Sequence, residues 1–167
     1  MLTSREHTTS FSGVRMRFDS DKSYGELIDA LFADIGETPV PIDEFPSMSQ
    51  TWEEYKHQVE PHVGPSGFML FSVFDHGAWI RSAGIDRKVL RVILGNPLIA
   101  ITMLRHDVTA GLFAPVELLV VEEADGRSSL SYVRPSSLMV IEPNAPLLAA
   151  AQQLDAKLEA LATKVVS

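Results

Sequence analysis

The chain contains no cysteine. Disulfides, zinc sites with thiolate ligands and a cysteine nucleophile are therefore excluded. The sequence also lacks a Ser-His-Asp order, a glycine-rich phosphate loop and an HExxH helix. Because these are the motifs that carry a recognisable chemistry, no reaction, cofactor or metal site is predicted from a motif.

Basic residues are few. Lysine and arginine number 14 against 22 aspartates and glutamates, so the formal net charge is −8. A broad nucleic-acid surface needs clustered lysine and arginine, and this balance argues against a nucleic-acid partner. It favours solubility and indicates little more.

Long apolar runs are absent too. Residues 1–10 lack the apolar core of a signal peptide. No run approaches the roughly 20 apolar residues that a membrane helix needs. We therefore expect a cytoplasmic protein with no membrane partner.

The 167 residues predict one domain, 1–167, with a core able to bury roughly 70% of the surface of the unfolded chain.

Residues 88–97 are its clearest element, because an aliphatic run ends at Gly95-Asn96-Pro97. This predicts an interior strand, a sharp corner, and a helix opened by Pro97. The other elements that the pattern predicts are strands at 12–18, 68–74, 115–123 and 128–133, and helices at 24–36, 98–106 and 136–141. Residues 68–74 are apolar on both faces, which favours a central strand, and Asp125-Gly126 predicts a hairpin.

Residues 37–66 interrupt this pattern with five prolines. Their middle, 49–62, predicts a short helix with Trp52, Tyr55 and Val59 on one side. We interpret the segment as an insertion that is either a lid or a surface-packed excursion.

The last helix is predicted from 144 to 165. Apolar residues recur along it at spacings of three and four: Leu147, Ala151, Leu154, Leu158, Leu161 and Val165. The stripe lasts under three heptads, which favours a helix lying on the sheet, and a coiled coil is the alternative.

Several short motifs occur in a specific order. They are Gly67-Phe68, Asp75-His76, Ala83-Gly84, Leu94-Gly95-Asn96-Pro97, Ala114-Pro115, Asp125-Gly126, Ser131-Tyr132 and Pro135. In this order the chain resembles the domain-of-unknown-function 302 family over 14–138, apart from 37–66. The resemblance implies an α+β fold: a helix-backed, mainly antiparallel sheet similar to the TATA-binding-protein-like architecture, often as a homodimer. It implies no established reaction or cofactor.

The chain departs from that family pattern in four ways. Leu94 stands where members usually have Phe, and Ala114 where they usually have Leu. The segment 37–66 is extra. The histidine that members tend to carry after the final strand is missing, because 136–144 contains none.

His76 is the first candidate for chemistry, because it follows Asp75 at a predicted strand end. A histidine there can be a general base, a ligand or a pH switch. The alternative is that Asp75 caps the next helix and His76 satisfies a turn carbonyl.

Arg91 and Glu117 each interrupt an otherwise apolar strand. A half-buried arginine must be paired. We therefore predict that the two side chains lie on one face of the sheet and either pair or line a polar cavity; a solvated face is the alternative.

The leading hypothesis is a domain that binds a small or apolar ligand in a pocket against the sheet. Asp75, His76 and Asn96 would supply polar contacts, with Arg91 and Glu117 as further ligand-binding candidates. Phe74, Trp79 and Met103 would form apolar walls. One alternative is an enzyme on a small substrate with His76 as general base, oriented by Asp75. The other is a structural or partner-binding dimer module that uses the last helix.

Overall fold

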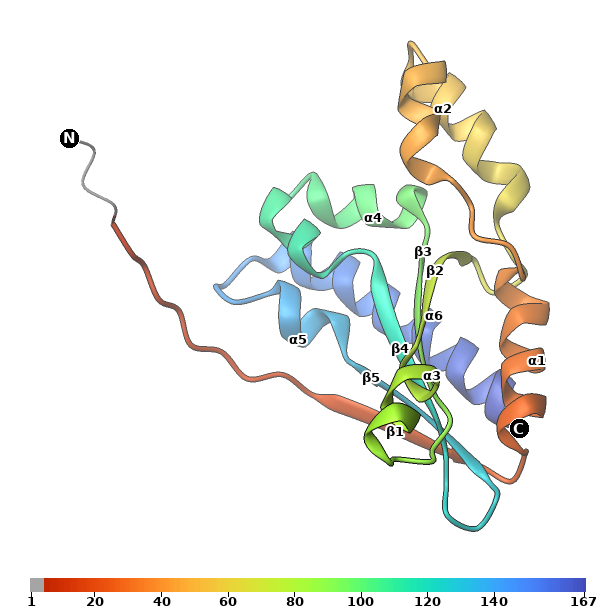
Figure 1. The fold of residues 1–167 in the computed structure, drawn as a ribbon. Helices are drawn as coiled ribbons and strands as arrows, with labels where there is room; N and C mark the ends of the chain where they lie inside the picture. The colour runs from red at the N-terminus through yellow and green to blue at the C-terminus, as the bar shows by residue number, and fades with distance from the viewer. Residues whose placement is uncertain (1–4) are drawn as a thin grey trace.

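A computed structural model of the chain describes residues 5–167. Five antiparallel strands form one sheet in the order β1-β5-β4-β3-β2 (Figure 1). The strands are β1 (Arg15–Ser20), β2 (Met69–Asp75), β3 (Val89–Gly95), β4 (Val116–Glu122) and β5 (Ser128–Val133). With helices on one face, this is the single α+β domain that the sequence predicted.

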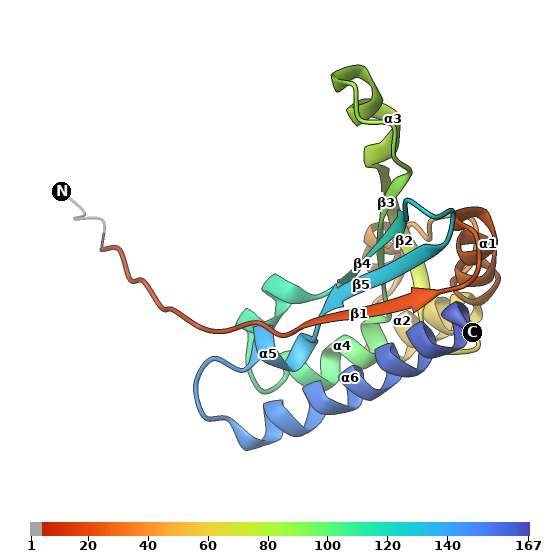
Figure 2. The same ribbon diagram turned by 90° about the horizontal axis from the view of Figure 1, so that it is seen from below.

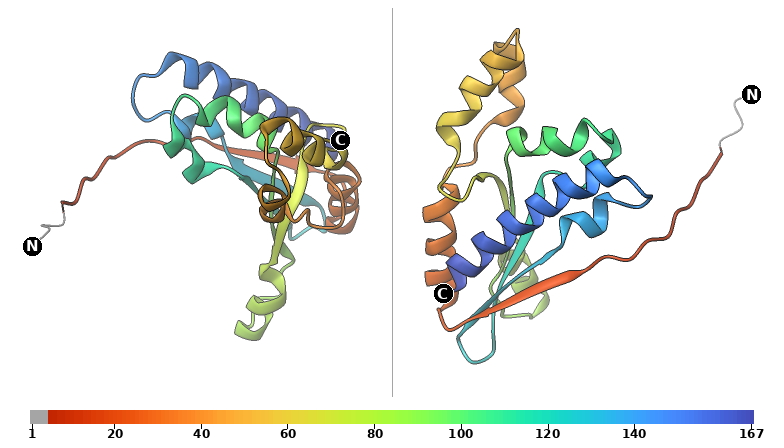
Figure 3. Two further views of the ribbon diagram at one scale, coloured as in Figure 1. Left: turned by 90° about the horizontal axis from the view of Figure 1, so that it is seen from above. Right: turned by 180° about the vertical axis from the view of Figure 1, so that it is seen from behind.

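The longer helices among the described residues cover one face of the sheet. These are α1 (Tyr24–Ile35), α4 (Pro97–Leu104) and α6 (Ala145–Val166). Figures 2 and 3 show α6 running along this face with α4 beside it, while no helix of residues 5–167 lies over the opposite face of β4 and β5. The remaining described segments are short: α2 (Trp52–Val59), α3 (His76–Ile80), α5 (Pro135–Met139) and the 3-10 helices η1 (Ile42–Met48), η2 (Glu60–His62), η3 (Arg81–Ala83) and η4 (Val108–Phe113).

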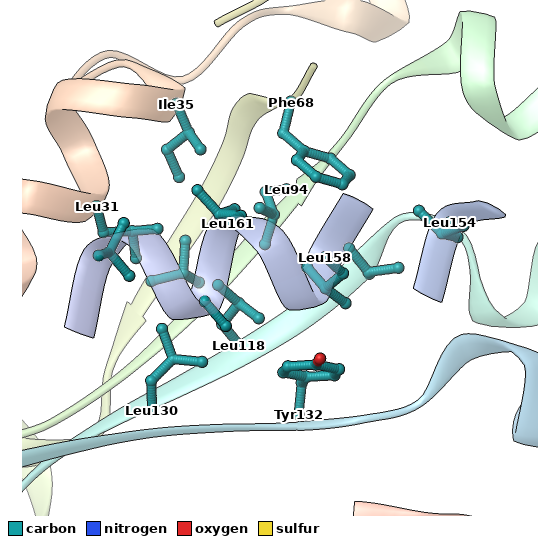
Figure 4. Packing of buried hydrophobic residues seen from close by; sticks show 14 of the residues in the cluster. Leu31, Ile35, Phe68, Leu94, Leu118, Leu130, Tyr132, Leu154, Leu158 and Leu161 are labelled. Carbon is teal, nitrogen blue, oxygen red and sulfur yellow. The ribbon is translucent and has the colours of Figure 1, made fainter. Parts of the chain in front are cut away.

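The apolar stripe of α6 faces the sheet. Leu154, Leu158 and Leu161 point towards the sheet side chains, among them Leu130 and Tyr132 (Figure 4). All of the stripe residues that the sequence singled out are buried in this core. The expectation of a helix lying on the sheet is therefore confirmed. The stripe is thus covered within the chain, and a structural or partner-binding dimer module stays a prediction.

The corner after β3 forms as predicted. Asn96 caps α4, since its side-chain oxygen accepts a hydrogen bond from the Leu98 backbone N–H at 2.8 Å, and Pro97 takes the first helical position. The Asn96 amide also donates to the Gly67 carbonyl at 2.9 Å. The Asn96 side chain therefore joins the start of α4 to the loop before β2.

Strand β2 lies at the edge of the sheet, so the prediction of a central strand at 68–74 is wrong. Both of its faces are apolar for another reason. Phe68 and Leu70 pack in the main core, whereas Met69 packs in a second small cluster with Phe45 and Val59. The second face is thus covered by residues of the 37–66 segment, in which α2 is the short helix that the sequence predicted.

The hairpin between β2 and β3 projects from the body of the protein. We call residues 73–91 the arm; it contains α3 and η3 and points away from α6 (Figure 2). Phe74, Trp79 and Ile85 are 50%, 63% and 49% exposed. The arm therefore presents large apolar side chains to solvent.

Candidate functional site

The uncovered face of the sheet carries a groove of about 770 Å³. Side chains alternate along β4, so Leu118 and Val120 are buried in the core while Leu119 and Val121 point to the other face. The floor of the groove is formed by Leu119 and Val121 of β4 with Ser129, Ser131 and Val133 of β5. The fold thus places a mostly apolar floor on the face of β4 and β5 that is turned away from α6.

Two short segments enclose one end of the groove. Leu112 and Phe113 come from η4, and Pro135 and Leu138 come from α5. Leu112 is 81% exposed, so it stands free at the rim. This end is apolar, because these four wall side chains carry no charge.

Charged side chains border the rest of the groove. Its lining includes four arginines and two glutamates: Arg15, Arg17, Arg87, Arg91, Glu117 and Glu123. Arg15 and Arg17 come from the outward face of β1, and Arg87 and Arg91 from the arm. The lining is therefore net positive in a chain whose formal charge is −8.

Arg91 and Glu117 form an ion pair across β3 and β4. Arg91 Nε donates to Glu117 Oε2 at 3.0 Å, and a second guanidinium nitrogen donates to the other carboxylate oxygen. The guanidinium also lies over the Phe74 ring, 5.7 Å from its centre. The predicted pairing is confirmed; ligand binding by these two residues stays a prediction. Their side chains are 38% and 53% exposed, and such pairs add little stability, between about 0 and 1 kcal/mol.

Two other arginines of the groove are held by neighbouring groups. Arg17 donates to Asp19 at 2.9 Å and to Glu123 at 3.0 Å, and hydrogen bonding to Asp19 is the largest cause that raises its pKa. Arg87 donates to the Glu122 carbonyl at 3.0 and 2.6 Å. Within residues 5–167, no hydrogen bond or ion pair is found for the Arg15 side chain.

The predicted polar contacts do not share one pocket. Asp75 pairs with Leu90 at one end of β2, whereas Met69 pairs with Gly95, next to Asn96, at the other. Six residues of extended chain separate these ends by about 20 Å. The prediction that Asp75, His76 and Asn96 line a common pocket is therefore wrong.

The predicted apolar walls also separate. Trp79 lies on the exposed arm, whereas Met103 is buried in the core at 1% exposure. Phe74 lies on the arm beside Arg91. Because these side chains point to different surroundings, they cannot form the walls of one cavity.

His76 makes a local contact. Its Nδ1 accepts a hydrogen bond from the Trp79 indole N–H at 3.2 Å, while Asp75 accepts one from the Ala78 backbone N–H at 3.0 Å and so caps α3. No hydrogen bond joins Asp75 to His76 in the described part of the chain, and neither residue lines the groove. The enzyme alternative thus loses the arrangement on which it was based.

Residues 5–167 contain neither a metal-binding cluster nor a membrane-spanning helix. No group of three or more histidine, aspartate or glutamate side chains is placed to hold a metal ion there. Across the same residues, no helix is both long enough and apolar enough to cross a membrane.

Comparison with known proteins places the chain in a family. A family model described as "Domain of unknown function DUF302" matches residues 45–165. This chain belongs to the DUF302 family. Its fold is similar to the crystal structure of an uncharacterized conserved DUF302 protein from Bacillus stearothermophilus, with a TM-score of 0.64 and 16% identity over 90% of this chain and 97% of that one. A search of curated proteins found no match.

The DUF302 match corrects the boundaries expected from the sequence. It ends at 165 and so includes α6, and it begins at 45, inside the segment interpreted as extra. The segment 37–66 also contributes no residue to the groove lining, so a lid role over this groove gains no support.

Several of the DUF302 motifs lie at turns and helix caps. Gly67, Gly84 and Gly126 have φ angles of +93°, +82° and +85°, a region that favours glycine, and Asp75 and Asn96 cap helices. These residues explain how the DUF302 chain turns from one element to the next. They do not line the groove, whereas Pro115, Ser131, Tyr132 and Pro135 of the other motifs do.

Several groove residues were missed in the sequence. Arg15 and Arg17 lie within the strand predicted at 12–18, and the structure places both on its exposed face. Their alternation with Met16 and Phe18 was the available signal. Their place beside the groove depends on β1 pairing with β5, which no local pattern reveals.

Proposed function

We propose that this DUF302 domain binds a small ligand with an apolar body in the groove on the open face of its sheet. The observation that carries this proposal is the groove itself. Its volume of about 770 Å³ falls in the range of about 300–1,000 Å³ that is typical of small-molecule sites. Such sites combine an apolar lining with a few polar groups, as this one does.

The composition of the floor supports the proposal. An antiparallel sheet with one face on the core usually carries polar side chains on its other face. Here Leu119, Val121 and Val133 occupy the open face, and Leu138 and Phe113 stand at its end. Exposed apolar side chains that gather in a concave surface are typical of ligand-binding grooves.

The proposal can be tested with N-phenyl-1-naphthylamine, a neutral probe that fluoresces in apolar surroundings. We expect saturable binding to the wild type. Ser131→Phe places a ring on the groove floor and is expected to weaken binding at least tenfold. Gln153→Phe, on the exposed side of α6, is the matched control and should bind as the wild type does.

Thermal melting of both variants shows whether each is folded. If Ser131→Phe is folded and binds the probe as tightly as the wild type, the groove is not the site. If the wild type does not bind the probe, the proposed function is wrong.

A second candidate is a homodimer formed through the arm. The observation that favours it is the exposure of Phe74, Trp79 and Ile85, each about half exposed or more. Sedimentation velocity would test it by comparing Trp79→Glu with Trp52→Glu, an exposed tryptophan on α2. A dimer that is lost only in Trp79→Glu supports the candidate. A wild type that stays monomeric across the concentration range contradicts it.

A further inference from the structure

The charge of the groove suggests the class of its ligand, an inference that rests on the proposed function. Four arginines and two glutamates line the groove, although the chain has 14 basic and 22 acidic residues. Positive charge is thus concentrated where the proposed ligand would bind. A groove with a net positive charge attracts ligands of negative charge.

Among the described residues, Arg15 is the one groove arginine whose side chain has no hydrogen-bond or ion-pair partner. Arg91 is paired with Glu117, Arg17 with Asp19 and Glu123, and Arg87 donates twice to a backbone carbonyl. Arg15 is exposed, and within residues 5–167 its guanidinium makes no hydrogen bond or ion pair. A guanidinium carries five N–H donors in a planar fork that matches a carboxylate.

The position of Arg15 places this fork beside the apolar end of the groove. Arg15 pairs with Val133 across β1 and β5. Leu138 lies next to Val133, because a Cβ built on Gly13 would meet Val133 Cγ1 at 3.3 Å and Leu138 Cδ2 at 3.7 Å. An unpaired cation and an apolar surface therefore adjoin each other in the same groove.

Glu117 is the acidic residue in line with Arg15 across the strands, and its charge is already balanced. Leu119 pairs with Ser131, so Glu117 lies opposite Val133 on the strand between Arg15 and the arm. The Glu117 carboxylate accepts two hydrogen bonds from Arg91. Its charge is thus balanced by Arg91, which leaves Arg15 as the unmatched charge at this end.

We infer that the groove recognises an amphipathic carboxylate, whose apolar body lies on Leu119, Val133 and Leu138 and whose carboxylate accepts hydrogen bonds from Arg15. Charge-assisted, bidentate hydrogen bonds of this kind fix the orientation of a ligand as well as adding affinity. The apolar end contributes by removing the ligand body from water.

The test compares decanoate with decan-1-ol, which have the same chain length and differ in charge. Both are titrated at pH 7.5, below the concentrations at which they aggregate, against the bound neutral probe N-phenyl-1-naphthylamine. We expect decanoate to displace the probe at a concentration at least tenfold lower than decan-1-ol. In Arg15→Gln this preference should be lost, so that decanoate displaces the probe no better than decan-1-ol does.

Arg105→Gln is the matched control. It removes one positive charge from an exposed arginine at the end of α4, outside the groove, and should keep the preference for decanoate. Equal displacement by the acid and the alcohol in the wild type, or a preference that persists in Arg15→Gln, would overturn the inference and leave the proposed function standing. Absence of probe binding would instead overturn both.

Discussion

Asp34 is a buried carboxylate that ties three parts of the chain together. Its side chain is 1% exposed, and it accepts hydrogen bonds from the Ser66 backbone N–H at 3.2 Å, from the Ser66 hydroxyl at 2.7 Å and from Lys164 Nζ at 2.6 Å. These contacts join α1, the loop before β2 and α6. We predict that Asp34→Ala lowers the free energy of unfolding by about 3 kcal/mol at pH 7.

The magnitude comes from the separate contacts. A hydrogen bond to a charged group contributes about 1.5–3 kcal/mol, and the two from Ser66 lie at a buried acceptor. The Lys164 side chain is 57% exposed, so solvent screens its attraction and Lys164→Met should cost about 1 kcal/mol or less. For a chain of this size, the loss in Asp34→Ala corresponds to a fall in Tm of about 6–12 °C.

The stability that the Asp34 carboxylate contributes should decrease as the pH falls. Burial raises the pKa of Asp34, but hydrogen bonds from Lys164 and Ser66 outweigh it, so the pKa lies below its ordinary value of 3.8. A carboxyl whose pKa is lower in the folded state stabilises the fold above its ordinary pKa. That contribution is lost as the pH falls through the lowered value.

Urea unfolding of the wild type and Asp34→Ala at pH 7 and pH 3 would measure this contribution. Asp29→Ala, on an exposed position of the same helix, is the control and should change stability by no more than about 0.5 kcal/mol. We expect the difference between the wild type and Asp34→Ala to shrink at pH 3. A cost below about 1 kcal/mol at pH 7 would refute the reasoning, as would a cost that is the same at both pH values.

Two further predictions concern the core and the corner. Burial raises the pKa of Tyr24 and Tyr132 to about 12, so a spectrophotometric titration should show both ionising well above pH 10. Because these tyrosines keep their protons in the folded state while the unfolded chain loses them near pH 10, stability should fall as the pH rises from 10 to 12; a stability that is flat there contradicts the assignment. Asn96→Ala removes the cap on Leu98 and the bond to Gly67, and should cost about 1–2 kcal/mol in urea unfolding; a change of only a few tenths would show that neither bond matters.

Much of the fold could be predicted because its signals are local. A β-branched run that ends in Gly95-Asn96-Pro97 specifies a strand, a cap and a helix start within ten residues. Asp125-Gly126 likewise specifies a hairpin, and Gly126 takes the positive φ that such a turn needs. These elements form where the sequence alone placed them.

The order of the strands could not be predicted in the same way. A strand that is apolar on both faces can lie inside a sheet, or at its edge with a second cluster packed on it. The second case holds here, because Met69 packs against Phe45 and Val59. The contact joins residues far apart in sequence, so no pattern within β2 could decide between the two.

The candidate site could also be predicted only in part, and for the same reason. Arg91 and Glu117 could be predicted as a pair, because a charge in an otherwise apolar strand needs a partner. Asp75 and Asn96 were placed together because both follow a predicted strand, yet antiparallel neighbours end on opposite sides of a sheet. The groove itself arises from the pairing of β1, β5, β4 and β3.

The most direct test of ligand binding in the groove is a ¹H–¹⁵N chemical-shift titration of the protein with N-phenyl-1-naphthylamine. Binding in the groove predicts that the largest shifts fall on β4 (Val116–Glu122), β5 (Ser128–Val133) and the adjoining η4 and α5. Shifts confined to the arm or to α2, or no shifts at saturating probe, would contradict it.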